Sequence, residues 1–206
     1  MVKWSVPPLW RGHTVAILAS GPSMSQEVAD LVRAAGIRAI VINSTYRLAP
    51  WADMLYAADA QWWREHPMAQ EFPGLRVSVS AMLGVLQLQN TGTEGYEPHR
   101  MGIRTGGNSG YQALHIAIHG EAERILLCGF DMSNRGGLHW HGAHPAPLRN
   151  TDDHSYTRWV ERFAALKDIG PEIINVTPGS AITCFPSMDL HEALDNEHHS
   201  RHAAAV

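Results

Sequence analysis

The stretch AILASGPS at residues 16–23 is an apolar run of β-forming residues that stops at small and polar ones. The stretch ILLCGFD at residues 125–131 has the same form, and the glycine-rich stretch TGGNSG at residues 105–110 leads into an apolar helical pattern. In an open parallel sheet, the loops at the carboxyl ends of the strands meet along one edge, where ligands bind. Glycines let backbone N–H groups approach a ligand, and a helix N-terminus favours an anion. These junctions therefore predict a crevice for a nucleotide or phosphate.

Around these junctions, apolar strands alternate with amphipathic helices. Strands are predicted at residues 14–19, 38–43, 53–57, 75–80, 124–128 and 172–176. Helices are predicted at residues 23–35, 60–66, 109–119, 153–169 and 190–196. Residues 82–104 are assigned to loop, and residues 135–150, which are rich in Gly, His and Pro, form a long loop of the kind that is usually functional or disordered.

Strands separated by helices of about a dozen residues are typical of βαβ units and a parallel sheet. Strands that are apolar throughout indicate that the sheet is covered on both faces. We therefore predict an α/β fold: a Rossmann-like three-layer sandwich with a mostly parallel sheet. One domain is expected to span residues 1–206, with an N-terminal arm over residues 1–12 and a flexible, histidine-rich tail over residues 197–206.

Composition narrows the class of protein. The chain has 206 residues, of which 45% are hydrophobic and 17% are charged, as in a soluble globular protein, and its net charge of −4 argues against nucleic acid as a partner. No apolar run approaches the ~20 residues of a membrane span, and the N-terminus lacks a secretory signal. Cys128 and Cys184 are expected to be free thiols. These features together predict a cytoplasmic location and no membrane partner.

The junctions supply the candidate binding residues. No Gly-Lys-Ser/Thr occurs, which excludes a P-loop, and the Gly-x-Gly-x-x-Gly of dinucleotide-binding folds is also absent. Each junction has a structural alternative: a helix cap at Ser23 or Asp59, or a simple turn at Asn43. The density of Gly, Asn and Ser at residues 106–110 exceeds what a cap needs. The candidate nucleotide-binding residues are Ser20, Gly21, Pro22, Ser23, Asn43, Asp59, Gly107, Asn108, Ser109, Gly110 and Gly129.

The candidate catalytic residues are Asp131, His139 and His141. Asp131 could bind ribose hydroxyls or a metal, or hold the next loop in place. In an extended backbone His139 and His141 would lie on one face, a spacing that permits a metal site, but no third ligand has a diagnostic spacing. We therefore predict no metal site and favour a general base or phosphate-binding histidine, with plain loop histidines as the alternative.

Other residues have mainly structural interpretations. Asp152 and Asp153 lie where a helix cap is needed, so a cap is favoured over an acidic metal pair. Trp62 and Trp63 are expected in the core or an interface, with a stacking platform for a ligand as the alternative. Together with Trp51 they could form the hot spot of a homo-oligomer.

Taken in order along the chain, these junctions resemble a known group. Gly21-Pro22-Ser23, Asn43, Tyr56, Asp59, Asn108-Ser109-Gly110 and Gly129-Phe130-Asp131 are similar to the motifs of the bacterial, campylobacter-type sialyltransferases and of the DUF115 group. That group includes an archaeal hydroxymethylpterin diphosphokinase, motility-associated glycosyltransferase-like proteins and small phage-encoded members. The resemblance covers residues 14–185 through short motifs, and the tyrosine pair expected after Asp131 is missing.

The resemblance implies a cytidine nucleotide surrounded by Gly21, Pro22, Ser23, Asn43, Ser109 and Gly110, with Gly129 and Asp131 beside it. It further implies a downstream histidine base, for which His139 and His141 are the nearest candidates. The predicted function is that of a nucleotide-dependent transferase, and a glycosyltransferase that uses a nucleotide-sugar donor is favoured. Apart from the nucleotide or nucleotide sugar, no cofactor is predicted. The alternatives are an ATP- and Mg²⁺-dependent pyrophosphoryl transferase and a non-catalytic phage protein that binds nucleotide. The base, the sugar and the acceptor are not specified by these residues.

Overall fold

The computed structural model describes residues 3–195, and its main feature is a seven-stranded sheet in the order β5-β4-β3-β2-β1-β8-β9. All paired strands of this sheet run parallel. The predicted Rossmann-like α/β fold is confirmed, and the sheet is fully rather than mostly parallel. Its strands are β1 (Thr14–Leu18), β2 (Arg38–Ile42), β3 (Met54–Tyr56), β4 (Leu75–Ser78), β5 (Leu86–Gln87), β8 (Arg124–Cys128) and β9 (Glu172–Asn175).

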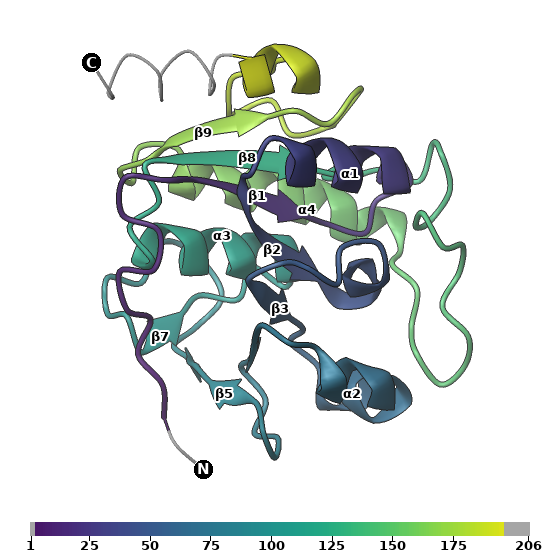
Figure 1. The fold of residues 1–206 in the computed structure, drawn as a ribbon. Coiled ribbons are helices and arrows are strands. Elements are labelled where there is room, and N and C mark those ends of the chain that lie inside the picture. The colour runs from purple at the N-terminus through teal and green to yellow at the C-terminus, as the bar shows by residue number, and fades with distance from the viewer. Residues whose placement is uncertain (1–2, 196–206) are drawn as a thin grey trace.

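Helices cover both faces of the sheet, so the molecule has three layers (Figure 1). The helices are α1 (Gln26–Ala34), α2 (Ala60–Glu65), α3 (Ser109–His119) and α4 (Asp153–Phe163), with 3₁₀ turns η1 (Asn43–Arg47), η2 (Pro67–Glu71) and η3 (Ala164–Leu166). A further helix at 190–195 ends the described chain. The predicted tail at 197–206 lies outside the described residues. No helix in the described part is long and apolar enough to cross a membrane.

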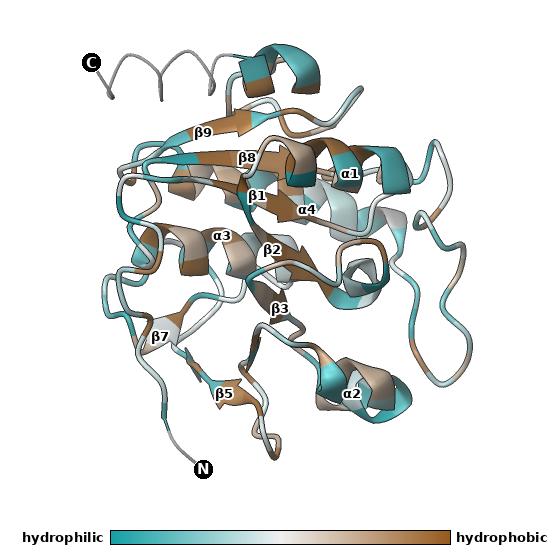
Figure 2. Ribbon diagram, in the orientation of Figure 1, coloured by the Kyte–Doolittle hydropathy of each residue, from teal (hydrophilic) through white to brown (hydrophobic). Residues whose placement is uncertain are grey.

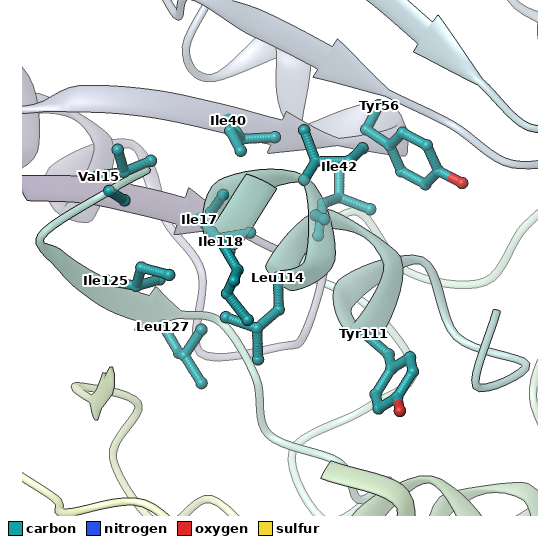
Figure 3. Packing of buried hydrophobic residues seen from close by; sticks show 14 of the residues in the cluster. Val15, Ile17, Ile40, Ile42, Tyr56, Tyr111, Leu114, Ile118, Ile125 and Leu127 are labelled. Atoms are coloured by element: carbon teal, nitrogen blue, oxygen red, sulfur yellow. The ribbon is translucent and has the colours of Figure 1, made fainter. Parts of the chain in front are cut away.

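Alternate residues of the strands enter two separate cores. Val15 and Ile17 of β1 and Ile125 and Leu127 of β8 point towards Leu114 of α3 (Figure 3). The residues between them on β1 and β8, such as Ala16 and Leu126, pack on the other face against α1, α2 and helix 190–195. In Figure 2 the central strands are correspondingly brown, and the exposed parts of the helices carry the hydrophilic colour. Burial on both faces explains why these strands are apolar throughout.

Residues 82–104, predicted as loop, contain three two-residue strands. β5 extends the main sheet, while β6 (Gln89–Asn90) and β7 (Gly102–Ile103) form a small parallel sheet of their own. The N-terminal arm is held against this region, where Trp4 N–H donates to the Gln87 carbonyl and Val6 N–H to the Arg100 carbonyl, both over 3.0 Å. Val6 and Trp10 are buried, so the arm is part of the core rather than a loose extension.

His115, on the buried face of α3, leads to a prediction about acid stability. Its Nδ1 bonds the Tyr111 carbonyl at 3.3 Å, and its Nε2 accepts from Glu97 N–H at 3.4 Å, which fixes a neutral tautomer. Burial lowers the pKa of His115 from 6.5 to about 4. The unfolded chain therefore binds a proton that the folded chain does not, and stability falls as the pH drops from 6.5 towards 4.

The shift corresponds to about 3 kcal/mol at ~1.4 kcal/mol per pKa unit. His115→Gln keeps a donor and an acceptor without a titrating group, so between pH 6.5 and 4 its free energy of unfolding should fall by about 3 kcal/mol less than that of the wild type. Urea unfolding over this pH range measures the difference. Parallel pH curves for the two proteins would refute the assignment.

Candidate functional site

A cavity of about 480 Å³ opens at the carboxyl edge of the sheet. It lies where the strand order reverses, because β2 lies on one side of β1 and β8 on the other. Ligands of open α/β sheets bind at such switch points. Every predicted site residue except Ser23 and His141 lines this cavity: Ser20, Gly21, Pro22, Asn43, Asp59, Gly107, Asn108, Ser109, Gly110, Gly129, Asp131 and His139.

The turn after β1 is fastened to the end of β8. Gly21 N–H donates to the Gly129 carbonyl over 3.0 Å, and a Cβ on Gly21 would lie 2.0 Å from Asp131 Oδ2. Ser23 donates its hydroxyl to Asp131 over 2.8 Å and its N–H to the same carboxylate over 3.2 Å. Ser23, a candidate nucleotide-binding residue, thus contacts Asp131 and is not among the residues that line the cavity. Burial raises the pKa of Asp131, and the carboxylate holds the preceding turn rather than the following loop.

The N-terminus of α3 forms another wall of the cavity. Asn108 caps the helix by accepting from Tyr111 N–H at 3.1 Å, and Gly107 adopts φ +68°, a backbone conformation that favours glycine. Ser109 and Gly110 follow in the first turn, whose N–H groups have no partners within the helix. This wall is the part of the cavity best suited to an anion. Gly110 also has a packing role, because a Cβ there would lie 2.6 Å from Phe130 Cε1.

Asn43 and Asp59 reach the cavity from the ends of β2 and β3. Asn43 has a left-handed backbone, with φ 49°, and begins η1. Asp59 precedes α2, but its side chain makes no capping hydrogen bond, so the structural alternative of a helix cap is wrong. The carboxylate is exposed and remains available to a ligand. Asp152, by contrast, caps α4 as predicted by accepting from Ser155 N–H over 2.8 Å.

The two adjacent tryptophans belong to the core, and Trp62 also lines the cavity. Trp62 is 4% exposed and Trp63 1% exposed, so the predicted interface hot spot with Trp51 is wrong for both. Trp62 stacks on His66 with ring centroids 4.3 Å apart, and Trp63 donates to the Ala57 carbonyl over 3.0 Å. Cys128 and Cys184 are free thiols, as predicted.

The long loop and α4 contribute residues that sequence reasoning missed. Tyr156 and Trp159 lie three positions apart on α4 and contact each other edge to face at 5.6 Å. Tyr156, Trp159 and Phe163 are spaced three and four residues apart, so they share one face of the helix, and this spacing could have indicated that Tyr156 and Trp159 lie together. The loop residues carried no such signal, because an irregular backbone has no period. The missed lining residues include Trp62, Gln61, Met132, Ser133, Leu138, His144, Leu148, Arg149, Thr151, Tyr156 and Trp159.

Three histidines of the loop gather beside the cavity. The ring centroids of His139, His141 and His144 lie 4.5–5.1 Å apart, and one ligand nitrogen of each lies within 4.8 Å of the others. Trp140 anchors the loop through its N–H to the Ser20 carbonyl at 3.2 Å and its Nε1 to Thr45 Oγ1 at 3.1 Å. Sequence reasoning did not identify His144, because the turn at Gly142, with φ +84°, brings it back towards the other two.

The three imidazoles are half-buried, and this favours their neutral forms. Burial lowers the pKa of His139, and burial together with the neighbouring imidazoles lowers the pKa values of His141 and His144 to about 4. Nε2 of His141 is buried and has no hydrogen-bond partner among residues 3–195. His139 and His144 line the cavity, whereas His141 lies behind them.

Comparison of the chain with protein-family models, with curated proteins and with solved structures finds no match in any of the three. A fold of this kind hosts many functions, so the basis for a function is the chemistry of the cavity.

Proposed function

We propose that this protein is a nucleotide-dependent transferase, in first place a glycosyltransferase that uses a nucleotide-sugar donor. The observation that carries the proposal is the N-terminus of α3 facing a cavity at the switch point of a parallel sheet. Backbone N–H groups and the helix dipole at Ser109 and Gly110 are suited to a nucleotide phosphate. The cavity volume of about 480 Å³ is within the range of small-molecule sites.

Other lining residues suit the remaining parts of such a donor. Trp159 and Tyr156 offer aromatic surface on which a base can stack. The carboxylate of Asp59 and the amide of Asn43 are suited to the hydroxyl groups of a ribose or sugar. Arg149 is the arginine of the lining and adds positive charge for a phosphate.

His139 supplies a base for the transfer step. Its imidazole lines the cavity, and its lowered pKa keeps it unprotonated near neutral pH. It would take the proton of an acceptor hydroxyl while the acceptor oxygen bonds to the sugar and the bond from the sugar to phosphate breaks, with the leaving phosphate held at α3. His139→Gln should therefore lower turnover by about 10²- to 10⁴-fold while nucleotide affinity changes little. The control His99→Gln replaces an exposed histidine outside the cavity and should leave turnover unchanged.

One observation keeps pyrophosphoryl transfer from ATP as a second candidate. Asp59 and Asp131 both line the cavity, and carboxylate oxygens are the ligands that Mg²⁺ uses beside phosphates. The two oxygens of Asp131 already accept from Ser23, which leaves them less available to an ion. For this reason glycosyl transfer, which needs no ion at these carboxylates, is preferred.

Phosphorus NMR of the protein with single donors tests the choice. CMP-, UDP- and GDP-sugars are incubated separately with and without a mixture of sugar acceptors, and ATP is incubated with Mg²⁺ and a mixture of hydroxyl acceptors. Release of free nucleotide from a nucleotide sugar is expected, and its loss in His139→Gln assigns it to the site. Release of AMP from ATP and Mg²⁺, with no release of nucleotide from any nucleotide sugar, would favour the second candidate. Binding of a nucleotide without turnover of any donor would indicate a non-catalytic nucleotide-binding protein.

A further inference from the structure

The histidine cluster has a feature that a single general base does not need. His139, His141 and His144 each offer a ring nitrogen, and these three nitrogens all lie within 4.8 Å of one another. Three half-buried imidazoles side by side stabilise each other poorly, because neutral rings offer no charge attraction and protonated rings would repel. One base would be served by one imidazole in this position.

We infer that His139, His141 and His144 bind a zinc ion whose open coordination position faces the cavity. Imidazole nitrogens are preferred ligands of Zn²⁺, and three protein ligands with a fourth open position are the arrangement of zinc sites that act on substrates. Ligand nitrogens about 2.0–2.1 Å from a tetrahedral ion lie about 3.4 Å apart. Modest rotations of the three rings would close the present separations of up to 4.8 Å to that value.

Two hydrogen-bonding observations support an ion at this point. Nε2 of His141 is buried with no partner among the described residues, and a buried nitrogen lone pair of this kind calls for a ligand. His139 bonds the backbone carbonyl of Ser20 through its ring, which is the outer contact that commonly orients a metal-binding histidine and fixes its tautomer. His139 is thereby held with its second nitrogen available to the ion. With zinc bound, His139 has no free nitrogen, so the general base of the proposed reaction would be a hydroxide at the open position, and His139→Gln would still lower turnover.

The surrounding charge indicates which fourth ligand the ion would take. Arg47 lies close enough to act electrostatically on both His141 and His144. Three neutral imidazoles, an arginine and a divalent ion together are strongly positive, so the open position would hold an anion, either hydroxide or a phosphate oxygen. His139 and His144 line the same cavity as the N-terminus of α3, which places this position beside the proposed phosphate subsite. This last assignment rests on the proposed function, whereas the zinc site itself does not.

Zinc binding by the full-length chain tests the inference. The protein is treated with a chelator, desalted and titrated with Zn²⁺ by calorimetry, and with Co²⁺ as a spectroscopic probe of tetrahedral coordination. One ion per chain is expected. His141→Ala and, as a second variant, His144→Gln should weaken binding by at least about 100-fold, since substitutions of outer residues alone cost about 10- to 100-fold.

Two matched controls separate this cluster from other histidines. His99→Ala removes an exposed histidine outside the cluster, and the combined variant His198→Ala, His199→Ala and His202→Ala removes the histidines near the C-terminus. Both should keep the affinity of the wild type. Loss of binding in the C-terminal variant, equal binding in both cluster variants, or no binding by the wild type would each overturn the inference. Nucleotide affinity of the metal-free protein is measured separately. Absence of zinc binding would therefore not bear on nucleotide binding, and absence of nucleotide binding would not bear on the zinc site.

Discussion

Gly21→Val is expected to lower the free energy of unfolding by roughly 3–5 kcal/mol, which is above the usual ~1–3 kcal/mol of overpacking because backbone atoms would have to move. A Cβ on Gly21 would lie 2.0 Å from Asp131 Oδ2 and 2.4 Å from the Gly129 carbonyl oxygen. The second contact is with backbone, which cannot rotate away, and the first is with a carboxylate held by Ser23. The turn after β1 would have to separate from the end of β8, and the floor of the cavity would be lost with it.

Urea unfolding measures this loss, and Gly136→Ala provides the control. Gly136 lies in the long loop, and a Cβ there would meet Pro22 at 3.3 Å, a contact that a small shift relieves. Its free energy of unfolding should stay within about 0.5 kcal/mol of the wild type. A Gly21→Val protein as stable as the wild type would show that the junction between β1 and β8 is not closed as described.

Ser109→Glu is expected to abolish nucleotide binding while leaving the fold intact. Ser109 is the first residue of α3 and lines the cavity. A carboxylate there would occupy the proposed phosphate subsite and repel the phosphate. Juxtaposed like charges cost several kcal/mol, which corresponds to a loss of more than about 100-fold in affinity. The fold should tolerate it, because an acidic residue in the first turn of a helix is favoured by the helix dipole.

Calorimetric titration of nucleotide into both proteins measures the effect. Ser5→Glu is the matched control, since it adds the same charge at an exposed position outside the cavity and should bind nucleotide as the wild type does. Thermal unfolding of Ser109→Glu without ligand verifies that the protein is folded. Equal nucleotide affinity in Ser109→Glu and the wild type would mean that the phosphate lies elsewhere.

The sheet and most helices could be predicted because burial leaves a clear pattern. β8 and α3 have the predicted bounds, since an apolar strand is covered on both faces and Asn108 and Gly120 delimit the helix. α1 begins at Gln26 rather than Ser23, because Ser23 is engaged by Asp131 and Ser25 takes the cap. The strands within 82–104 are two residues long, too short for any periodic pattern to reveal.

Only the site residues at the ends of strands could be predicted, because the sheet topology alone brings them together. Residues at the carboxyl ends of β1, β2, β3 and β8 meet because parallel strands share an edge, and this rule brought Asn43, Asp59 and Asp131 together with α3. The rule does not extend to residues 132–151, where the path of the loop depends on local contacts such as Trp140 to Thr45. His144 and Arg149 therefore had no signal that joined them to the cavity.

The central claim is that the cavity between β1, β8 and α3 binds a nucleotide, and a thermal-unfolding screen of the wild type tests it most directly. CMP, CDP, UDP, GDP, ADP and ATP are each added with and without Mg²⁺. A ligand at 100 times its dissociation constant stabilises a protein by about 2.7 kcal/mol, which gives a clear rise in melting temperature. We expect such a rise with at least one nucleotide in the absence of Mg²⁺. An unchanged melting temperature with every nucleotide, with and without Mg²⁺, would contradict the claim.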